Sequence, residues 1–417
     1  MKLNLKVKTI ISIVAFVLIF VGLVLMASFL DFQISGILTK GVLAEGEYFA
    51  TDFFGVMLES VGCIPIYLFI AFVLCVLFWS SLKIGVPYKS AGKWNTKKPL
   101  NIVCAVICAI GVVAACWYAI KDSVGYIFEH TLNATGNIAE NLEALDKFEH
   151  SAAVYGVEAV FGLIMGALAI VATMHFNVET LKKLLKFVLA AACAVLLANV
   201  LIMIIKDPIG RMRFRAINST LGAGYIESGQ VQGYTPWYVI NHQPSKEILA
   251  EFKSIYGVKD AFKSFPSGHT CSAGTLYTLI MIPTLFGWTG NKKKLGATIA
   301  CWAVPAVYTG LVAISRIMVG AHYMSDVTFG GTLAFACAVI MWEIFICKGS
   351  HFFALFPNAR KKAPAKSEAE KEENSANVAV HDIINYQGIV IINNAELQAA
   401  EAENSQVNDV INDASAE

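Results

Sequence analysis

The stretch from Ile10 to Leu30, IISIVAFVLIFVGLVLMASFL, contains no charged residue. A helix needs about 20 predominantly apolar residues to cross the hydrocarbon core of a bilayer. The apolar region of a secretory signal peptide is shorter, about 7–15 residues, and is followed by a small-x-small cleavage site. No clear site of that kind follows Leu30. The stretch therefore predicts an uncleaved membrane anchor.

The composition of the whole chain points the same way. Of the 417 residues, 56% are hydrophobic and 15% are charged, and the mean hydropathy is +0.60. Soluble domains carry about 25% charged residues. Much of the chain is therefore expected to lie where charge is costly, in lipid. The net charge of +1 offers no basic field for nucleic acid.

Eight stretches are long and apolar enough to span a membrane. The predicted spans are 9–30, 55–82, 101–120, 152–175, 184–205, 270–287, 295–315 and 326–347. The predicted fold class is therefore all-α, a polytopic bundle of about eight transmembrane helices. All ten cysteines fall inside apolar stretches, which predicts small core side chains rather than disulfides. No CxxC pair or Cys/His cluster suggests zinc, and we expect neither a metal nor a cofactor.

Lys and Arg gather at alternate ends of the spans. Lys2, Lys6 and Lys8 precede the first span, and a basic loop at 83–98 follows the second. Acidic residues dominate the first and third loops. Because positive loops stay in the cytoplasm, we expect both termini and the even-numbered loops to be cytoplasmic. The odd-numbered loops then face outward, across what we expect to be the plasma membrane.

These patterns divide the chain into three predicted parts. Residues 1–95 carry two spans and the basic loop, and residues 96–350 carry six more spans. Residues 351–417 form an acidic tail that we expect to be disordered in the cytoplasm. The fifth loop, 206–269, is long and rich in aromatic residues, so we expect it to fold as a cap on the outer side.

Residues able to do chemistry gather in three clusters at the outer ends of spans. They are KDPIGRMRFR at 206–215, FPSGHT at 265–270 and SRIMVGAHYMSD at 315–326. All three lie on the same side of the membrane in the predicted orientation. More than 100 residues separate the first cluster from the third.

Each cluster contributes a group suited to phosphate. Lys206, Arg213 and Arg316 are cations that repel one another unless an anion lies among them, and arginine matches phosphate with paired donors. Ser267 and Gly268 open a predicted helix, whose free N–H groups favour an anion. Arg211 and Arg215 flank Arg213, so the choice of guanidinium rests on spacing, which favours Arg213.

Two histidines and an aspartate complete the predicted site. His322 and Asp326 are four residues apart and would share a face if the segment is helical. A carboxylate bonded to one ring nitrogen leaves the other nitrogen as a nucleophile. His269 would then be placed to protonate the leaving oxygen.

The three clusters resemble the signature of the type 2 phosphatidic acid phosphatase (PAP2) superfamily, K-x6-R-P, P-S-G-H and S-R-x5-H-x3-D. Phe214 stands where the family has proline, and the other positions match. The resemblance covers residues 100–348 and implies that the last six spans form a PAP2-like core.

The resemblance also implies a reaction. It implies a phosphatase that hydrolyses a phosphate monoester or pyrophosphate without a metal, through a phosphohistidine intermediate. His322 would be the nucleophile, Asp326 its orienting residue and His269 the acid. The implied phosphate ligands are Lys206, Arg213, Ser267, Gly268 and Arg316. The expected partners are a lipid phosphate and the bilayer, and the oligomeric state is not readable.

Two alternatives stay open on the sequence alone. An alcohol instead of water as acceptor would make the same site a phosphotransferase. The second alternative is a non-catalytic lipid-binding or transport protein, which the intramembrane acids Glu59 and Glu158 and the acidic tail support. For each of these acids, a structural ion pair and a role in the substrate site remain possible.

Overall fold

The computed structural model describes residues 4–356, except 51, 86, 91–92, 97, 134–146 and 149–150. The chain divides into two compact units, residues 1–351 and 352–417. Only residues 352–356 of the second unit are described, so the predicted acidic tail lies almost entirely outside the described residues. All the long apolar helices of the described chain belong to the first unit.

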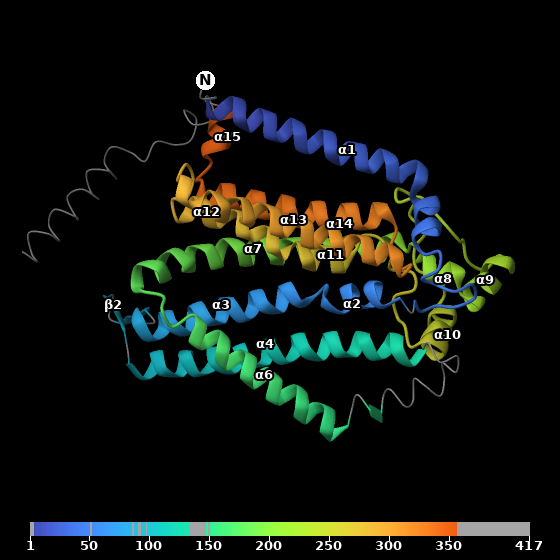
Figure 1. Ribbon diagram of the computed structural model, residues 1–417, viewed down its shortest axis with the longest axis horizontal. Helices are drawn as coiled ribbons and strands as arrows, with labels where there is room; N and C mark the ends of the chain where they lie inside the picture. Colours follow the sequence, from blue (N-terminus) through green and yellow to red (C-terminus); the bar gives the residue numbers. More distant parts are fainter. Residues whose placement is uncertain are drawn as a thin grey trace, which may run out of the picture. The chain divides into compact units, whose positions relative to one another are not determined.

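Long apolar helices account for most of the described chain (Figure 1). The helices, in chain order, are α1 (Leu5–Leu38), α2 (Phe53–Val61), α3 (Ile64–Lys83), α4 (Lys98–Asn133), α6 (Ala152–Ala172), α7 (Val178–Ile209), α8 (Phe214–Asn218), α9 (Thr220–Glu227), α10 (Lys246–Tyr256), α11 (Gly268–Ala273), η1 (Gly274–Ile280), α12 (Met281–Leu285), η2 (Lys292–Lys294), α13 (Leu295–Met318), α14 (Met324–Met341), η3 (Trp342–Ile346) and α15 (Ser350–Leu355). One short antiparallel hairpin is described, β1 (Pro87–Ser90) with β2 (Lys93–Thr96). The predicted polytopic helical bundle is confirmed.

Seven helices among the described residues are long and apolar enough to cross a membrane, compared with eight predicted spans. The difference lies at 270–287, which forms a segmented run of α11, η1 and α12 instead of one helix. A Cβ on Gly274 would lie 2.5 Å from Cβ of Ala334, so η1 packs closely on α14. Pro283 lacks an N–H group for the helical ladder. Periodicity alone did not reveal this break.

The bundle packs around α7. Its small residues Ala190, Ala191, Ala194 and Ala198 are buried in the largest apolar core, to which α3, α11, α12 and α14 also contribute. Many apolar side chains on the outer faces of α1, α4, α6 and α13 are exposed. Exposed apolar faces of this kind suit a lipid environment, and the chain is a multi-pass membrane protein. All ten cysteines are unpaired, and none is exposed.

The fifth loop folds into a cap at one end of the bundle, where Figure 1 shows α8, α9 and α10 together. The cap shares an aromatic core with the segment between α1 and α2, consisting of Phe252, Tyr256 and Phe262 of the cap and Tyr48 and Phe49 of that segment. The chain enters the cap at Gly210, whose φ of 60° is left-handed. A Cβ there would lie 1.8 Å from the carbonyl oxygen of His242, so only glycine fits this turn.

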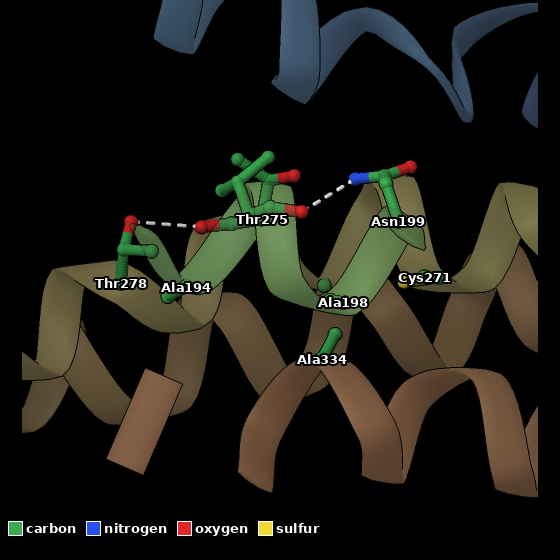
Figure 2. A pocket seen from close by; sticks show the side chains of 9 residues that line it. Ala194, Ala198, Asn199, Cys271, Thr275, Thr278 and Ala334 are labelled. Carbon is green, nitrogen blue, oxygen red and sulfur yellow. Dashed lines mark hydrogen bonds between the residues drawn. The ribbon is translucent and has the colours of Figure 1, made fainter. Parts of the chain in front are cut away.

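A small cavity lies inside the bundle between α7, α11, η1 and α14 (Figure 2). Its polar groups are satisfied locally. Asn199 Nδ2 donates to the carbonyl of Val195 at 2.8 Å, and Thr278 Oγ1 donates to the carbonyl of Thr275 at 2.8 Å. None of the predicted site residues lines this cavity. The chemistry has to be sought at the cap end instead.

Candidate active site

Backbone hydrogen bonds join the three clusters beneath the cap, although more than 100 residues separate the first from the third. The joining bonds, from N–H to carbonyl oxygen, are Ser264 to Arg211 (3.0 Å), Arg215 to Gly320 (2.7 Å) and Ser267 to Asp326 (2.9 Å). Each cluster is therefore held to another by main-chain groups. The prediction that the clusters meet on one side of the bundle agrees with this arrangement.

His322 is completely buried and lies in the turn between α13 and α14. Its Nδ1 lies 2.6 Å from the carbonyl oxygen of Ser264. A carbonyl only accepts, so Nδ1 carries the proton and Nε2 keeps its lone pair. No described residue hydrogen-bonds to Nε2. The turn thus presents the tautomer that a nucleophilic imidazole requires.

The prediction that His322 and Asp326 share a helical face is wrong in its geometry. α14 begins only at Met324, so His322 precedes the helix. Asp326 Oδ2 lies 3.6 Å from His322 Nδ1, beyond a normal hydrogen bond. That oxygen accepts instead from Ser264 Oγ at 2.5 Å and from the backbone N–H of Tyr323 at 2.9 Å. Ser264 therefore orients the ring directly, and Asp326 acts through its charge and through Ser264.

The protonation of His322 follows from its surroundings. Burial, together with the nearby cations Arg213 and Arg316, lowers the pKa of His322 to about 3, although Asp326 opposes this effect. The ordinary pKa of histidine is about 6.5. The imidazole is therefore neutral near pH 7, which is the nucleophilic form.

His269 lies in the first turn of α11, two residues after the N-cap residue Ser267. Ser267 Oγ accepts from the Thr270 backbone N–H at 3.4 Å and from Thr270 Oγ1 at 3.0 Å. The ring of Tyr126 contacts His269 edge-on, with 5.2 Å between centroids. His269 Nε2 has no hydrogen-bond partner among the described residues. Its ring nitrogen is thus available for proton transfer.

The cations of the site come from three different elements. Lys206 lies near the end of α7, and its Nζ is 3.6 Å from where a Cβ on Gly268 would stand. Arg316, near the end of α13, is buried and forms an ion pair with Glu59 of α2. Of the two roles left open for Glu59, an ion pair and a part in the substrate site, the structure shows the buried ion pair. Its partner is nevertheless one of the predicted phosphate ligands.

The three arginines of the first cluster take different positions. Arg211 is fully buried and donates from Nε, NH1 and NH2 to protein groups. Arg215 lies 3.9 Å from Glu59, with its guanidinium 4.8 Å from the ring centre of Tyr48. Arg213 pairs with Asp260 of the cap, whose side chain is 45% exposed. Arg213 is therefore the arginine of this cluster that lies beside a partly solvated group.

Asp260 was not anticipated as a neighbour of the site. Burial alone would raise the pKa of its carboxyl, but Arg213, Arg215 and Lys206 outweigh that effect and lower the pKa to about 2. Asp260 is therefore ionised at any physiological pH and keeps Arg213 in place from the cap. The sequence offered only an acid within an aromatic loop, which is too common a feature to single out.

Asp31 was also missed. The first span was predicted to end at residue 30, which assigned Asp31 to the outward loop. The helix instead runs to Leu38, and Asp31 is buried within it with 1% exposure. Arg211 NH2 donates to its Oδ2 at 2.9 Å, and the Ser325 backbone N–H donates to its Oδ1 at 2.9 Å. α1 thus reaches the third cluster.

A further group lies at the other end of α14. The ligand atoms of Glu343, Cys347 and His351 lie within 4.8 Å of one another. No Cys/His cluster was expected from the sequence, because eight residues separate the outer two. Glu343 already accepts from the His351 backbone N–H at 2.8 Å and lies 2.7 Å from His351 Nδ1. These bonds close the end of the helix and account for the grouping.

The approach of α14 to the second cluster yields a testable prediction. A Cβ on Gly330 would lie 2.4 Å from the carbonyl oxygen of Ser267. Gly330→Ala is therefore expected to displace the turn that carries Ser267 and His269. A misplacement of about 1 Å costs on the order of 10²-fold in rate, which a phosphate-release assay measures. Gly310→Ala, where nothing lies within 4 Å of a Cβ, is the matched control. Equal activity in both variants would contradict the close contact.

These features define a class, a helical membrane protein with two histidines and several cations, buried or half-buried, gathered at one end of its bundle. Residues 184–348 match the model of the PAP2 superfamily. A lipid A 1-phosphatase from Rhizobium etli is 37% identical over 84 residues, which is 19% of this chain and 30% of that protein. The match thus spans about 30% of the length of this curated relative. No solved structure matches the chain.

Proposed function

We propose that the protein is a membrane phosphatase that hydrolyses a lipid or isoprenoid phosphate monoester or pyrophosphate through a phosphohistidine intermediate. The observation that carries the proposal is that two imidazoles lie close enough to influence each other electrostatically. His269 and His322 each have an Nε2 without a hydrogen-bond partner among the described residues. Lys206, Arg213 and Arg316 supply positive charge from three elements. The relative named as a lipid A phosphatase supports a lipid phosphate as the substrate class.

The proposed first step transfers the phosphoryl group to the enzyme. His322 Nε2 attacks phosphorus, and the bond from phosphorus to the leaving oxygen breaks as the P–N bond forms. His269 gives a proton to that oxygen. The cations, with Ser267 and the N–H groups at the start of α11, hold the phosphate oxygens and stabilise the charge that develops. Asp326 and the carbonyl of Ser264 stabilise the imidazole as it gains positive character.

The second step regenerates the enzyme. Water attacks phosphorus, His269 accepts a proton from it, and the P–N bond breaks to release phosphate and neutral His322. No metal takes part in either step, and we expect no cofactor. We further propose that the site faces outward at the plasma membrane, with both termini in the cytoplasm. The alternation of basic and acidic loops supports this orientation.

The proposal is tested by phosphate release from a panel of lipid phosphates and pyrophosphates in detergent. We expect release to be unchanged within about twofold by EDTA, because the cations replace the charge that Mg²⁺ supplies in other phosphoryl-transfer sites. Loss of activity in EDTA with recovery on Mg²⁺ would contradict the mechanism. Adding alcohols distinguishes the phosphotransferase, which would yield a new phosphate ester. Failure of a folded sample to turn over any compound, with or without an alcohol, would favour the non-catalytic alternative.

A further inference from the structure

We propose that Asp31 of α1 is a positioning residue for catalysis, which sets the charge and orientation of Asp326 through Arg211 and Ser325. This inference rests on the proposed function. It assigns a role at the site to a helix outside the matched segment 184–348. The residues that carry it are called the Asp31 network and consist of Asp31, Arg211, Ser325, Asp326 and Ser264.

The contacts of Arg211 form the centre of the Asp31 network. NH2 donates to Asp31 at 2.9 Å, and NH1 donates to Asp326 Oδ1 at 2.5 Å and to Ser325 Oγ at 2.7 Å. Nε donates to the carbonyl of Thr235 at 2.9 Å. The side chains of Arg211, Asp31 and Asp326 are all fully buried. One guanidinium is therefore shared between two carboxylates in a medium where charges interact strongly.

The sharing has an electrostatic consequence for Asp326. With Asp31 present, the two carboxylates and one guanidinium carry a net charge of −1. Without the charge of Asp31, Arg211 would neutralise Asp326 alone. Asp326 lies 3.6 Å from His322 Nδ1, so its remaining negative charge stabilises the imidazole as phosphoryl transfer makes it positive. Asp31 thus preserves the negative charge that the nucleophile needs nearby.

Asp31 also fixes the start of α14. Its Oδ1 accepts from the backbone N–H of Ser325 at 2.9 Å, and its Oδ2 accepts from Ser325 Oγ. Ser325 is the second residue of α14, where an N–H group has no partner within the helix. The N-cap residue, Tyr323, makes no side-chain cap bond to the helix. A carboxylate from α1 therefore caps the helix that carries Asp326 one residue later.

The decisive variant is Asp31→Asn. It retains the size of the side chain and leaves Arg211 with one carboxylate, so no buried charge is left unpaired and the bundle should fold. In metal sites, residues that orient the ligands from behind affect activity by about 10–100-fold, and Asp31 stands in the same relation to Asp326. We expect kcat to fall by that factor. KM for the lipid phosphate should change by less than about threefold, because Asp31 does not contact the phosphate ligands proposed above.

Two further variants separate this role from mere packing. Asp31→Glu restores the charge and should recover part of the lost kcat. Ser35→Ala is the packing control. Ser35 lies one turn after Asp31 on α1, and its Oγ is buried without a hydrogen-bond partner among the described residues. It should leave kcat within about twofold. Rapid-quench measurement of phosphoenzyme formation should show the same order, wild type above Asp31→Glu above Asp31→Asn.

The outcomes distinguish this inference from the proposed function. If His322→Ala is inactive while folded Asp31→Asn keeps its kcat within twofold, the role of Asp31 is refuted and the proposed function stands. A loss in Asp31→Asn that Asp31→Glu does not reduce, or that Ser35→Ala shares, also refutes it. If Asp31→Asn does not fold, the test rests on Asp31→Glu. A wild-type KM with a two- to tenfold lower kcat in Asp31→Glu supports the role, and an unchanged kcat refutes it. Full activity in His322→Ala would instead refute the proposed function.

Discussion

His322→Ala is expected to lower phosphate release at least about 10³-fold, because it removes the atom that would accept the phosphoryl group. Loss of a nucleophile leaves only the contribution of binding and charge stabilisation, as in other enzymes that form covalent intermediates. The measurement is steady-state phosphate release by detergent-purified protein with a saturating lipid phosphate. KM is of little use here, since the residual turnover would follow another route.

The control for that variant is the same substitution elsewhere. His175 is exposed near the turn between α6 and α7, and His175→Ala should retain full activity. Thermal unfolding in detergent shows whether His322→Ala keeps its fold, because the substitution also removes the hydrogen bond to the Ser264 carbonyl. A folded His322→Ala protein with more than a tenth of the wild-type rate would exclude His322 as the nucleophile.

His269→Gln is expected to have the second-largest effect, and its size should depend on the leaving group. General acid catalysis contributes about 10²–10⁴-fold. For an alkyl phosphate, whose alkoxide leaves only with a proton, the rate should fall by that amount. For an aryl phosphate with an electron-withdrawing ring, the phenolate leaves without help, and the loss in the first step should be less than about tenfold. Burst kinetics separate this step from hydrolysis of the intermediate.

Tyr126→Phe is the companion control for His269. It preserves the ring that lies 5.2 Å from the imidazole and should leave both substrates within a fewfold of the wild-type rate. Equal losses of His269→Gln on alkyl and aryl phosphates would contradict the role as acid. In that case the residue would serve phosphate binding or the geometry of the turn instead.

The parts of this molecule that could be predicted from sequence depend on local composition. Apolar runs such as Ile10–Leu30 are set by the thickness of the bilayer, so the helical bundle followed directly. The three clusters were also accessible, because each is contiguous and lies at a predicted span end. Their joining hydrogen bonds, such as Ser267 N–H to the Asp326 carbonyl, agree with the expectation that they meet.

The parts that could not be predicted depend on contacts between distant segments. Asp31 was predicted to lie in a loop because the hydropathy falls after Leu30. The helix instead continues to Leu38, and the Asp31 carboxylate within it binds Arg211 and Ser325. The direct partner of His322 is a backbone carbonyl, which carries no signal in the residue type. The segmented run at α11, η1 and α12 likewise reflects the close packing of Gly274 on α14, in addition to Pro283 within the run.

The N-terminal helices were left without a role by the sequence, and the structure connects them to the site. Asp31 of α1 binds Arg211, and Glu59 of α2 binds Arg316. Both acids balance the charge of buried arginines. Arg316 is a phosphate ligand implied by the family signature, and Arg211 is a neighbour of another, Arg213. Removing one partner of a buried pair generally costs about 3–5 kcal/mol, so Arg316 is expected to depend on Glu59 of α2. Arg211 keeps Asp326 as a partner when Asp31 is neutralised, so the stability of the bundle should depend less on Asp31.

The most direct test of the central claim is to trap the covalent intermediate on His322. Protein mixed with a labelled lipid phosphate is quenched within one turnover and divided between acid and alkali. We expect a label that is stable in alkali, lost in acid and mapped to His322 by mass spectrometry of the digested protein. A label on another residue, or rapid turnover with no phosphoenzyme and no burst of product, would contradict the phosphohistidine mechanism.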